Sequence, residues 1–219
     1  MSVITFVRHG QANSNATTEE DYDRLSDLGR QQAKWLGQLW DYNEMSFDAV
    51  FSGTLTRQID TLELLNVKRA PAAQRDARLN EIQYHNLVAC MEQQFNMSPP
   101  TEGTGFIDHF HTTFEKWEQG EIQSPPETWN NYETRVRALL NDLRHSGQNV
   151  LAVTSGGIVA MALAQALGVG RLPLVKFLLE GVNTGITQLH YLHGEFHVKQ
   201  FNSVPHLEML ERLDKRTYY

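Results

Sequence analysis

Short apolar runs alternate with amphipathic segments along most of the chain. Three runs are rich in β-branched or aromatic residues and are bounded by polar ones, as in buried strands: residues 3–7, 47–51 and 149–153. Two further runs, residues 186–192 and 196–201, flank a short polar turn and predict a β-hairpin.

Apolar residues at helical spacing fill the stretches between these predicted strands. Ser26 can cap the helix that follows it, and residues 158–167 predict an apolar helix directly after the third strand. Another helix follows residues 52–54 and carries Arg57. The clearest helical stripe is Tyr132, Val136, Leu139, Leu140 and Leu143.

This alternation predicts an α/β fold, a three-layer sandwich in which a mostly parallel central sheet is covered by helices on both faces. Such sheets bind ligands beyond the carboxyl ends of their strands. Polar residues and glycines gather at three such ends: Arg8-His9, Ser52 to Arg57, and Ser155-Gly156-Gly157. We expect these segments to meet and to form the functional site.

The regular alternation stops between residues 85 and 131. This segment contains two Ser-Pro-Pro sequences and a glycine-rich stretch, with one predicted helix between them. Its aromatic residues at helical spacing are more typical of core packing than of a substrate-binding wall: Phe106, Phe110, Phe114 and Trp117. We expect a partly helical, cap-like insertion over the strand ends, within a single domain that spans residues 1–219.

Composition narrows the class of protein. Of 219 residues, 41% are hydrophobic, which is enough for a sizeable core. No apolar run approaches the roughly 20 residues of a membrane span, and we recognise no leader sequence. The net charge of −7 argues against nucleic-acid or membrane partners, although a local pocket can still bind phosphate. The single cysteine, Cys90, favours a reducing compartment, so we expect a cytoplasmic protein.

Six motifs follow one another along nearly the whole chain: Arg8-His9-Gly10 with Asn15 following, the segment from Leu25 to Ala33, the run of Ser52, Leu55, Arg57 and Thr61, then Leu79-Asn80-Glu81, Ser155-Gly156-Gly157, and Asn183 to Thr187. This ordered series resembles the histidine phosphatase superfamily, also called phosphoglycerate mutase-like. An isolated Arg-His-Gly triplet carries little information, whereas the ordered series is specific.

The resemblance implies a phosphatase that acts on a small phosphorylated substrate, with His9 as nucleophile and Glu81 as general acid and base. An imidazole nitrogen is a good nucleophile near neutral pH and forms a labile phosphohistidine. The residues after Glu81 depart from the tryptophan- and glycine-containing run that usually follows this glutamate in the family. We expect no metal and no cofactor, because His109 and His111 diverge on a helix and no other ligand cluster is visible.

Five residues are candidate phosphate ligands. Arg8 and Arg57 have planar guanidinium groups that suit phosphate oxygens. The resemblance adds Asn15, and backbone N–H groups at a helix that starts near Ser155 and Gly156 would form an anion site.

Serine at position 155 departs from the family pattern, which has a second histidine there. A hydroxyl can donate one hydrogen bond but cannot carry a positive charge. Three hypotheses therefore stand: a phosphomonoester hydrolase with altered or modest activity, a non-catalytic phosphate-binding or interaction protein on the same fold, and a phosphoglycerate mutase. The mutase is disfavoured because it needs both imidazoles.

Overall fold

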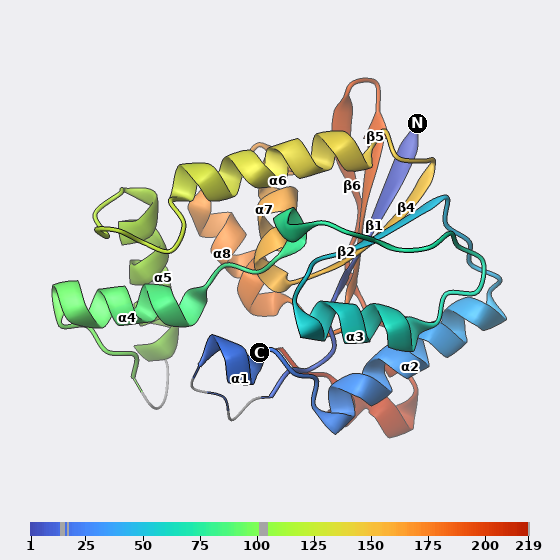
Figure 1. Cartoon of the computed structure of the whole chain (residues 1–219), viewed down its shortest axis with the longest axis horizontal. Helices are drawn as coiled ribbons and strands as arrows, with labels where there is room; N and C mark the ends of the chain where they lie inside the picture. Colours follow the sequence, from blue (N-terminus) through green and yellow to red (C-terminus); the bar gives the residue numbers. More distant parts are fainter. Residues whose placement is uncertain (14–15, 17, 101–104, 219) are drawn as a thin grey trace.

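A six-stranded sheet forms the centre of the computed structural model (Figure 1), which describes residues 1–13, 16, 18–100 and 105–218. The strand order is β3-β2-β4-β1-β5-β6. The strands are β1 Ser2–Arg8, β2 Ala49–Ser52, β3 Gln74–Arg75, β4 Asn149–Thr154, β5 Ile186–Leu192 and β6 Glu195–Ser203. The first four pair in parallel, whereas β5 runs antiparallel to β1 and to β6. The expected mostly parallel sheet is confirmed, with the predicted hairpin at one edge.

Helices follow most of the strands. The α-helices are α1 Glu19–Tyr22, α2 Asp27–Tyr42, α3 Thr56–Leu65, α4 Tyr84–Phe95, α5 Gly105–Glu118, α6 Trp129–Leu143, α7 Gly156–Leu167 and α8 Arg171–Glu180. Short 3-10 helices are η1 Ala77–Leu79, η2 Pro205–Leu207 and η3 Leu210–Lys215. Ser26 caps α2 as predicted, because its hydroxyl accepts a hydrogen bond from the Gly29 N–H at 3.0 Å.

Helices cover both faces of the sheet because its central strands are apolar on both sides. Ile4 and Phe6 of β1 pack in one core with residues of α6 and α7, whereas Val7 packs in a second core with residues of α2 and α3. Successive strand residues point to opposite faces, so a continuous apolar run supplies both cores. The result is the expected three-layer arrangement, with α2 and α3 on one side and α6 and α7 on the other (Figure 1).

The segment between residues 85 and 131 contains two helices where we predicted one. Helix α4 ends at Asn96, which adopts a left-handed conformation with φ 53°, and two prolines, Pro99 and Pro100, follow before α5 begins. A proline lacks the N–H that a continuing helix needs, so the two segments cannot merge. The aromatic stripe of α5 lies largely in the core: Phe110, Phe114 and Trp117 are buried there, and Phe106 and Phe110 also border a cavity.

Helix α8 has no counterpart among the predicted elements. Pro173 lies near its start, and Gly170 is its N-cap residue. Proline is tolerated in the first turn of a helix, where its missing N–H would be unpaired in any case. In the part of the chain that the structure describes, every helix is too short or too polar to cross a membrane.

Candidate active site

His9 directly follows β1, and its backbone is held from two sides. Its N–H donates to the Thr154 carbonyl at the end of β4 at 2.8 Å, and its own carbonyl accepts from Asn183 Nδ2 at 3.1 Å. The next residue, Gly10, passes so close to α2 that a Cβ there would lie 2.4 Å from the Gly29 carbonyl oxygen. The sequence thereby fixes the imidazole at the carboxyl ends of β1 and β4.

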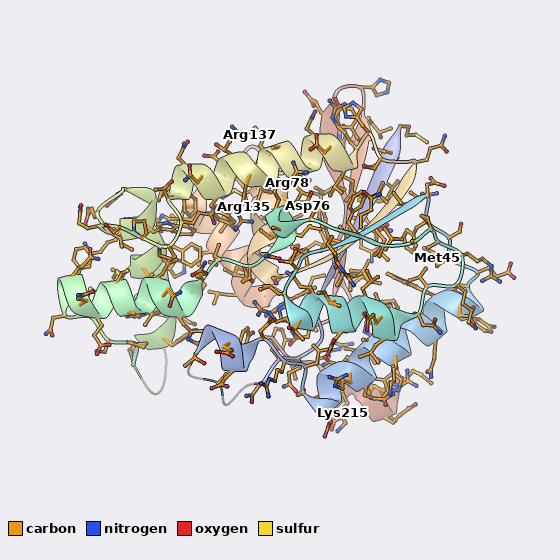
Figure 2. The ribbon with its side chains drawn as sticks, in the orientation of Figure 1. Met45, Asp76, Arg78, Arg135, Arg137 and Lys215 are labelled. Atoms are coloured by element: carbon orange, nitrogen blue, oxygen red, sulfur yellow. The ribbon has the colours of Figure 1, made fainter. Side chains whose placement is uncertain are left out.

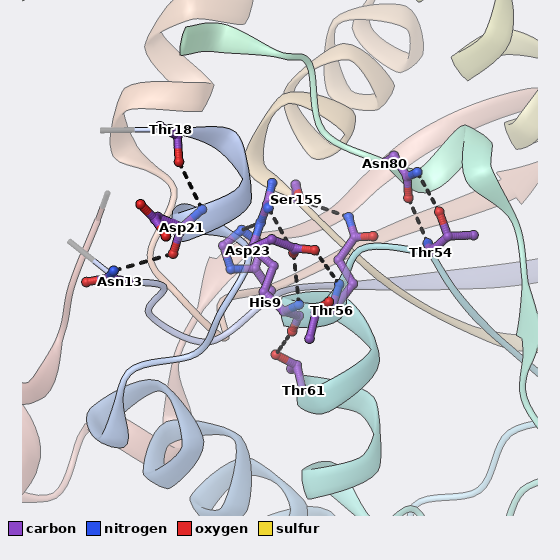
Figure 3. Close-up of polar contacts among 12 residues, drawn as sticks. His9, Asn13, Thr18, Asp21, Asp23, Thr54, Thr56, Thr61, Asn80 and Ser155 are labelled. Carbon is purple, nitrogen blue, oxygen red and sulfur yellow. Dashed lines mark hydrogen bonds and ion pairs between the residues drawn. The ribbon is translucent and has the colours of Figure 1, made fainter. Parts of the chain in front are cut away.

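The two ring nitrogens of His9 have different partners, and these partners assign the tautomer. Figure 3 draws His9 with neighbouring polar residues, among them Asp23, Thr56 and Ser155. Nδ1 lies 2.8 Å from the Gly10 carbonyl oxygen, which can only accept, so Nδ1 carries the proton. Nε2 accepts from Arg57 Nε at 3.3 Å, and a guanidinium can only donate. The lone pair of the imidazole is therefore on Nε2 and points to a cation.

The environment of His9 favours the neutral ring. Burial, reinforced by the positive charges of Arg57 and Arg8, holds the pKa of His9 well below its usual value of 6.5. The ring is only 1% exposed. A neutral imidazole at physiological pH is the form that can act as a nucleophile.

Arg57 is oriented by two residues of the segment after Gly10. Asp23 Oδ1 accepts from both the backbone N–H and Nη1 of Arg57 at 3.1 Å, and its Oδ2 accepts from the Thr56 N–H at 2.8 Å. The Arg57 guanidinium also lies 4.9 Å from the ring centre of Tyr22. Asp23 therefore caps α3 and pairs with its first cation at the same time.

Arg8 lies at the same strand end and borders the start of α7. Its Nη1 donates to the carbonyl oxygens of Gly181 and Tyr218, while its Nε has no partner among the described residues. A Cβ on Gly156 would lie 2.9 Å from Leu178 Cδ1 and 3.5 Å, an ordinary contact distance, from Arg8 Nε. Burial lowers the pKa of Arg8 from its usual value. The structure thus brings Arg8, His9, Arg57 and Gly156 together.

Ser155 occupies the N-cap position of α7 but does not cap it. Its hydroxyl accepts a hydrogen bond from Gln58 Nε2 at 2.8 Å, and both side chains are 0% exposed. Gln58 also donates to the Leu79 carbonyl at 2.8 Å, so it links α3, η1 and the start of α7. The serine lies beneath the site, in a neutral buried pair.

Glu81 lies at the N-terminus of α7. Both of its carboxylate oxygens accept from the Gly157 N–H at 3.1 Å, and Oε1 also accepts from the Ile82 N–H at 2.9 Å. One of the helix N–H groups that we expected to bind phosphate is thus already paired with a carboxylate of the protein itself.

The loop that carries Glu81 is pinned by α6. Arg135 Nη1 donates to the carbonyl oxygens of Arg78 and Asn80, at 2.7 and 3.1 Å, on the two sides of Leu79. Arg135 and Arg78 are labelled next to each other in Figure 2. Arg135 is itself held by Glu127, at 2.6 Å from Nε and 2.8 Å from Nη2. This chain of contacts fixes the backbone from which Glu81 extends.

A cavity of about 340 Å³ opens beside these groups. Arg8, Arg57 and Glu81 line it, together with Tyr22. His9 and Ser155 do not line the cavity. The ring of His9 contacts two residues that do, Arg57 and Tyr22. Asn15 lies outside the described residues. Within the described ranges, no group of three or more His, Cys, Asp or Glu side chains is placed to hold a metal ion.

The sequence profile of the histidine phosphatase superfamily (branch 1) matches residues 4–204. The chain belongs to this superfamily. No curated protein matches the sequence of this chain significantly.

Solved structures place this superfamily member among proteins of the same fold. Phosphoserine phosphatase from Entamoeba histolytica has a TM-score of 0.67 and 22% identity, over 94% of this chain and 100% of that one. Alpha-ribazole phosphatase from Shigella flexneri has a TM-score of 0.67 and 19% identity, over 92% and 96% of the two chains. At these identities the likeness establishes the shared fold alone.

The sequence analysis did not identify the residues that hold the side chains and backbone of the candidate active site in place. Leu55 stands at the N-cap position of α3 and offers no side-chain acceptor, so the helix needs a cap from elsewhere, which Asp23 provides. That missing cap is a signal that could have prompted a search for a carboxylate. Gln58 and Arg135 gave no signal in the sequence, because their partners are backbone groups or side chains far along the chain.

Proposed function

We propose that the protein hydrolyses small phosphomonoesters through a phosphohistidine at His9. The observation that carries the proposal is the pair of hydrogen bonds on the imidazole, which puts the proton on Nδ1 and the lone pair on Nε2, facing Arg57. A neutral nucleophile next to a guanidinium suits attack on a phosphoryl group. Membership of the superfamily supports the reaction class.

In the first step, Nε2 attacks phosphorus and the bond to the leaving oxygen breaks. Arg57 turns its N–H groups from Nε2 to the phosphoryl oxygens, and Arg8 adds a second guanidinium. The Nδ1 proton keeps the Gly10 carbonyl as its acceptor, which stabilises the positive charge that the ring gains. Glu81, in its protonated form, gives its proton to the leaving alcohol.

In the second step, water attacks the phosphohistidine. Glu81 takes a proton from the water, the N–P bond breaks, its electron pair returns to Nε2, and inorganic phosphate leaves. Gly156 N–H, the Ser155 hydroxyl and Asn15 are further proposed ligands of the phosphoryl oxygens. No metal or cofactor takes part in either step.

Binding without turnover is the second candidate, and the Gln58–Ser155 pair favours it. A unit charge about 4 Å from a phosphate oxygen is worth roughly 4 kcal/mol at an effective dielectric near 20, and a serine hydroxyl cannot supply it. The loss slows the chemistry by up to about three powers of ten if nothing compensates.

A phosphatase screen tests the proposal. The named substrates of the structural neighbours, phosphoserine and α-ribazole 5′-phosphate, start the panel, followed by diverse sugar, nucleoside and aromatic phosphates. We expect release of phosphate by the wild type and by His145→Ala, a variant of an exposed histidine, and none by His9→Ala. Tight binding of inorganic phosphate with no turnover of any ester would instead support the binding protein.

A further inference from the structure

The cavity beside the proposed phosphate site has a mostly apolar wall. Its side chains come from the loop before α4, from α4, from α5 and from α8: Ile82, Tyr84, Phe106, Phe110, Leu178 and Leu179. Three segments distant in sequence thus converge on one surface. The wall is a product of the tertiary fold and not the outer face of a single amphipathic helix.

Charged side chains on this cavity are confined to the proposed reaction groups. Among the described lining residues, the only Lys, Arg, Asp or Glu side chains are Arg8, Arg57 and Glu81. The two guanidinium groups are assigned to the phosphoryl oxygens and the carboxylate to proton transfer. His85, Tyr22 and Tyr84 add polar atoms to the lining, but a carboxylate or ammonium on the leaving group would lose its hydration without gaining a lysine, arginine, aspartate or glutamate of its own among the described lining residues.

Aromatic rings give the wall a defined shape. The ring centre of Phe110 lies 5.0 Å from that of Tyr84 and 6.0 Å from that of Phe106. Phe110 also stacks at 4.7 Å on Phe114, which is 0% exposed in the core. Because the rings are anchored before a ligand arrives, an apolar group can bind with little ordering cost.

We infer that the site selects phosphomonoesters whose leaving group is uncharged and apolar, with an aromatic or aliphatic body of about one or two rings. The inference rests on the proposed function for the phosphoryl end of the substrate. The cavity volume of about 340 Å³ is in the range of small-molecule sites and leaves room for such a body next to a phosphoryl group. Tyr84, Phe110 and Leu179 are the specificity-determining residues.

Phosphonates that cannot be hydrolysed test the inference independently of turnover. Calorimetry on the wild-type protein would compare 3-phenylpropylphosphonate with 3-phosphonopropionate, in which a carboxylate replaces the ring and its adjacent methylene. We expect the phenyl compound to bind at least about tenfold more tightly. Equal affinities, tighter binding of the carboxylate compound, or no binding of either compound would overturn the inference.

Two leucines of α8 provide a matched pair of variants. Leu179 lines the cavity, whereas Leu172 is 54% exposed and does not. Leu179→Ser should weaken binding of 3-phenylpropylphosphonate about fivefold and leave that of 3-phosphonopropionate unchanged, because only the ring contacts the wall. Leu172→Ser should change neither affinity. An equal loss for both ligands in Leu179→Ser would contradict the assigned wall.

Turnover separates this inference from the proposed function. 2-Phenylethyl phosphate and 3-phosphoglycerate are both esters of alkyl alcohols, so their rates report binding of the leaving group more than its acidity. We expect kcat/KM at least about tenfold higher for the phenyl ester. Equal kcat/KM values would overturn the ligand class while supporting the phosphatase. Selective binding of the phenyl phosphonate without hydrolysis of either ester would support the ligand class while overturning the proposed phosphatase activity.

Discussion

Gln58 Nε2 donates one hydrogen bond to the Ser155 hydroxyl and another to the Leu79 carbonyl, both at 2.8 Å. Both side chains are 0% exposed, so the amide fills the space beside the serine. The resemblance of the sequence motifs to the superfamily predicts an imidazole at position 155. A neutral, buried hydrogen-bonded pair therefore stands where a group able to carry charge is expected.

This pair predicts that an imidazole at position 155 needs space made at position 58. In a Gln58→Ala background, Ser155→His should bind vanadate about tenfold more tightly than Gln58→Ala alone, because a cation is restored beside the bound anion. The gain should shrink as pH rises through the pKa of the new histidine. Vanadate inhibition measured across pH checks this. A gain that is independent of pH, or no gain, would contradict the placement of position 155 next to the phosphoryl group.

Glu81 and Arg135 should show the same kinetic signature. Glu81→Gln should slow hydrolysis most for substrates with poor leaving groups, since a good leaving group needs little protonation. Arg135→Met releases the backbone that carries Glu81 and should reproduce this dependence with about a tenfold fall in kcat. Arg137→Met is the control, because its side chain is 65% exposed on the same helix. Equal slowing of all substrates by Arg135→Met would indicate a loss of stability alone.

Asp23 has two roles that two substitutions separate. Asp23→Ala removes both the cap of α3 and the carboxylate that orients Arg57, so unfolding should cost about 1 kcal/mol less and kcat/KM should fall about tenfold. Asp23→Asn can still cap, so it should retain most of the stability while its kcat/KM falls. Urea unfolding and steady-state kinetics check both. If Asp23→Asn lost as much stability as Asp23→Ala, the charge and not the cap would dominate.

Two buried histidines predict loss of stability in acid. Burial, together with Arg57 and Arg8, holds the pKa of His9 well below 6.5, and burial together with Arg212 lowers the pKa of His206 to about 3. Below pH 6.5 both histidines become protonated in the unfolded chain but stay neutral in the folded protein. Their contribution to the free energy of unfolding is therefore complete above pH 6.5 and decreases as the pH falls below it.

The expected slope is about 1.4 kcal/mol per pH unit for each histidine, down to about pH 3 for His206. Urea titrations at several pH values measure the slope. His206→Gln should reduce the slope by about 1.4 kcal/mol per pH unit, the contribution of one histidine. A free energy of unfolding that stays constant between about pH 7 and pH 5 would show that these rings are not buried in neutral form.

The fold and the reacting residues were predictable to different degrees, for physical reasons. Short apolar runs such as residues 149–153 predict strands because both faces of a parallel sheet are buried, and the polar residues after them predict the site edge. The convergence of Arg8, His9 and Arg57 follows from that topology. Their catalytic roles, and those of Glu81 and Ser155, stay predictions.

The supporting residues could not be predicted, because each acts through a contact distant in sequence. Gln58 reads as an ordinary helix residue until the fold places Ser155 against it. Arg8 was assigned to phosphate from its residue type, whereas its carbonyl partners, Gly181 and Tyr218, come from segments without a motif. Phe110 borders the cavity together with Arg8 of β1 and Leu179 of α8, a convergence that helical spacing alone does not indicate.

Trapping of the phosphoenzyme tests the central claim most directly. The wild-type protein would be mixed with 4-nitrophenyl phosphate, whose good leaving group makes the second step limiting, and quenched in base during the first turnover. The account predicts protein-bound phosphate that is stable in base, labile in acid, present in His145→Ala and absent in His9→Ala. Turnover of the ester without any protein-bound phosphate, or protein-bound phosphate that persists in His9→Ala, would contradict the account.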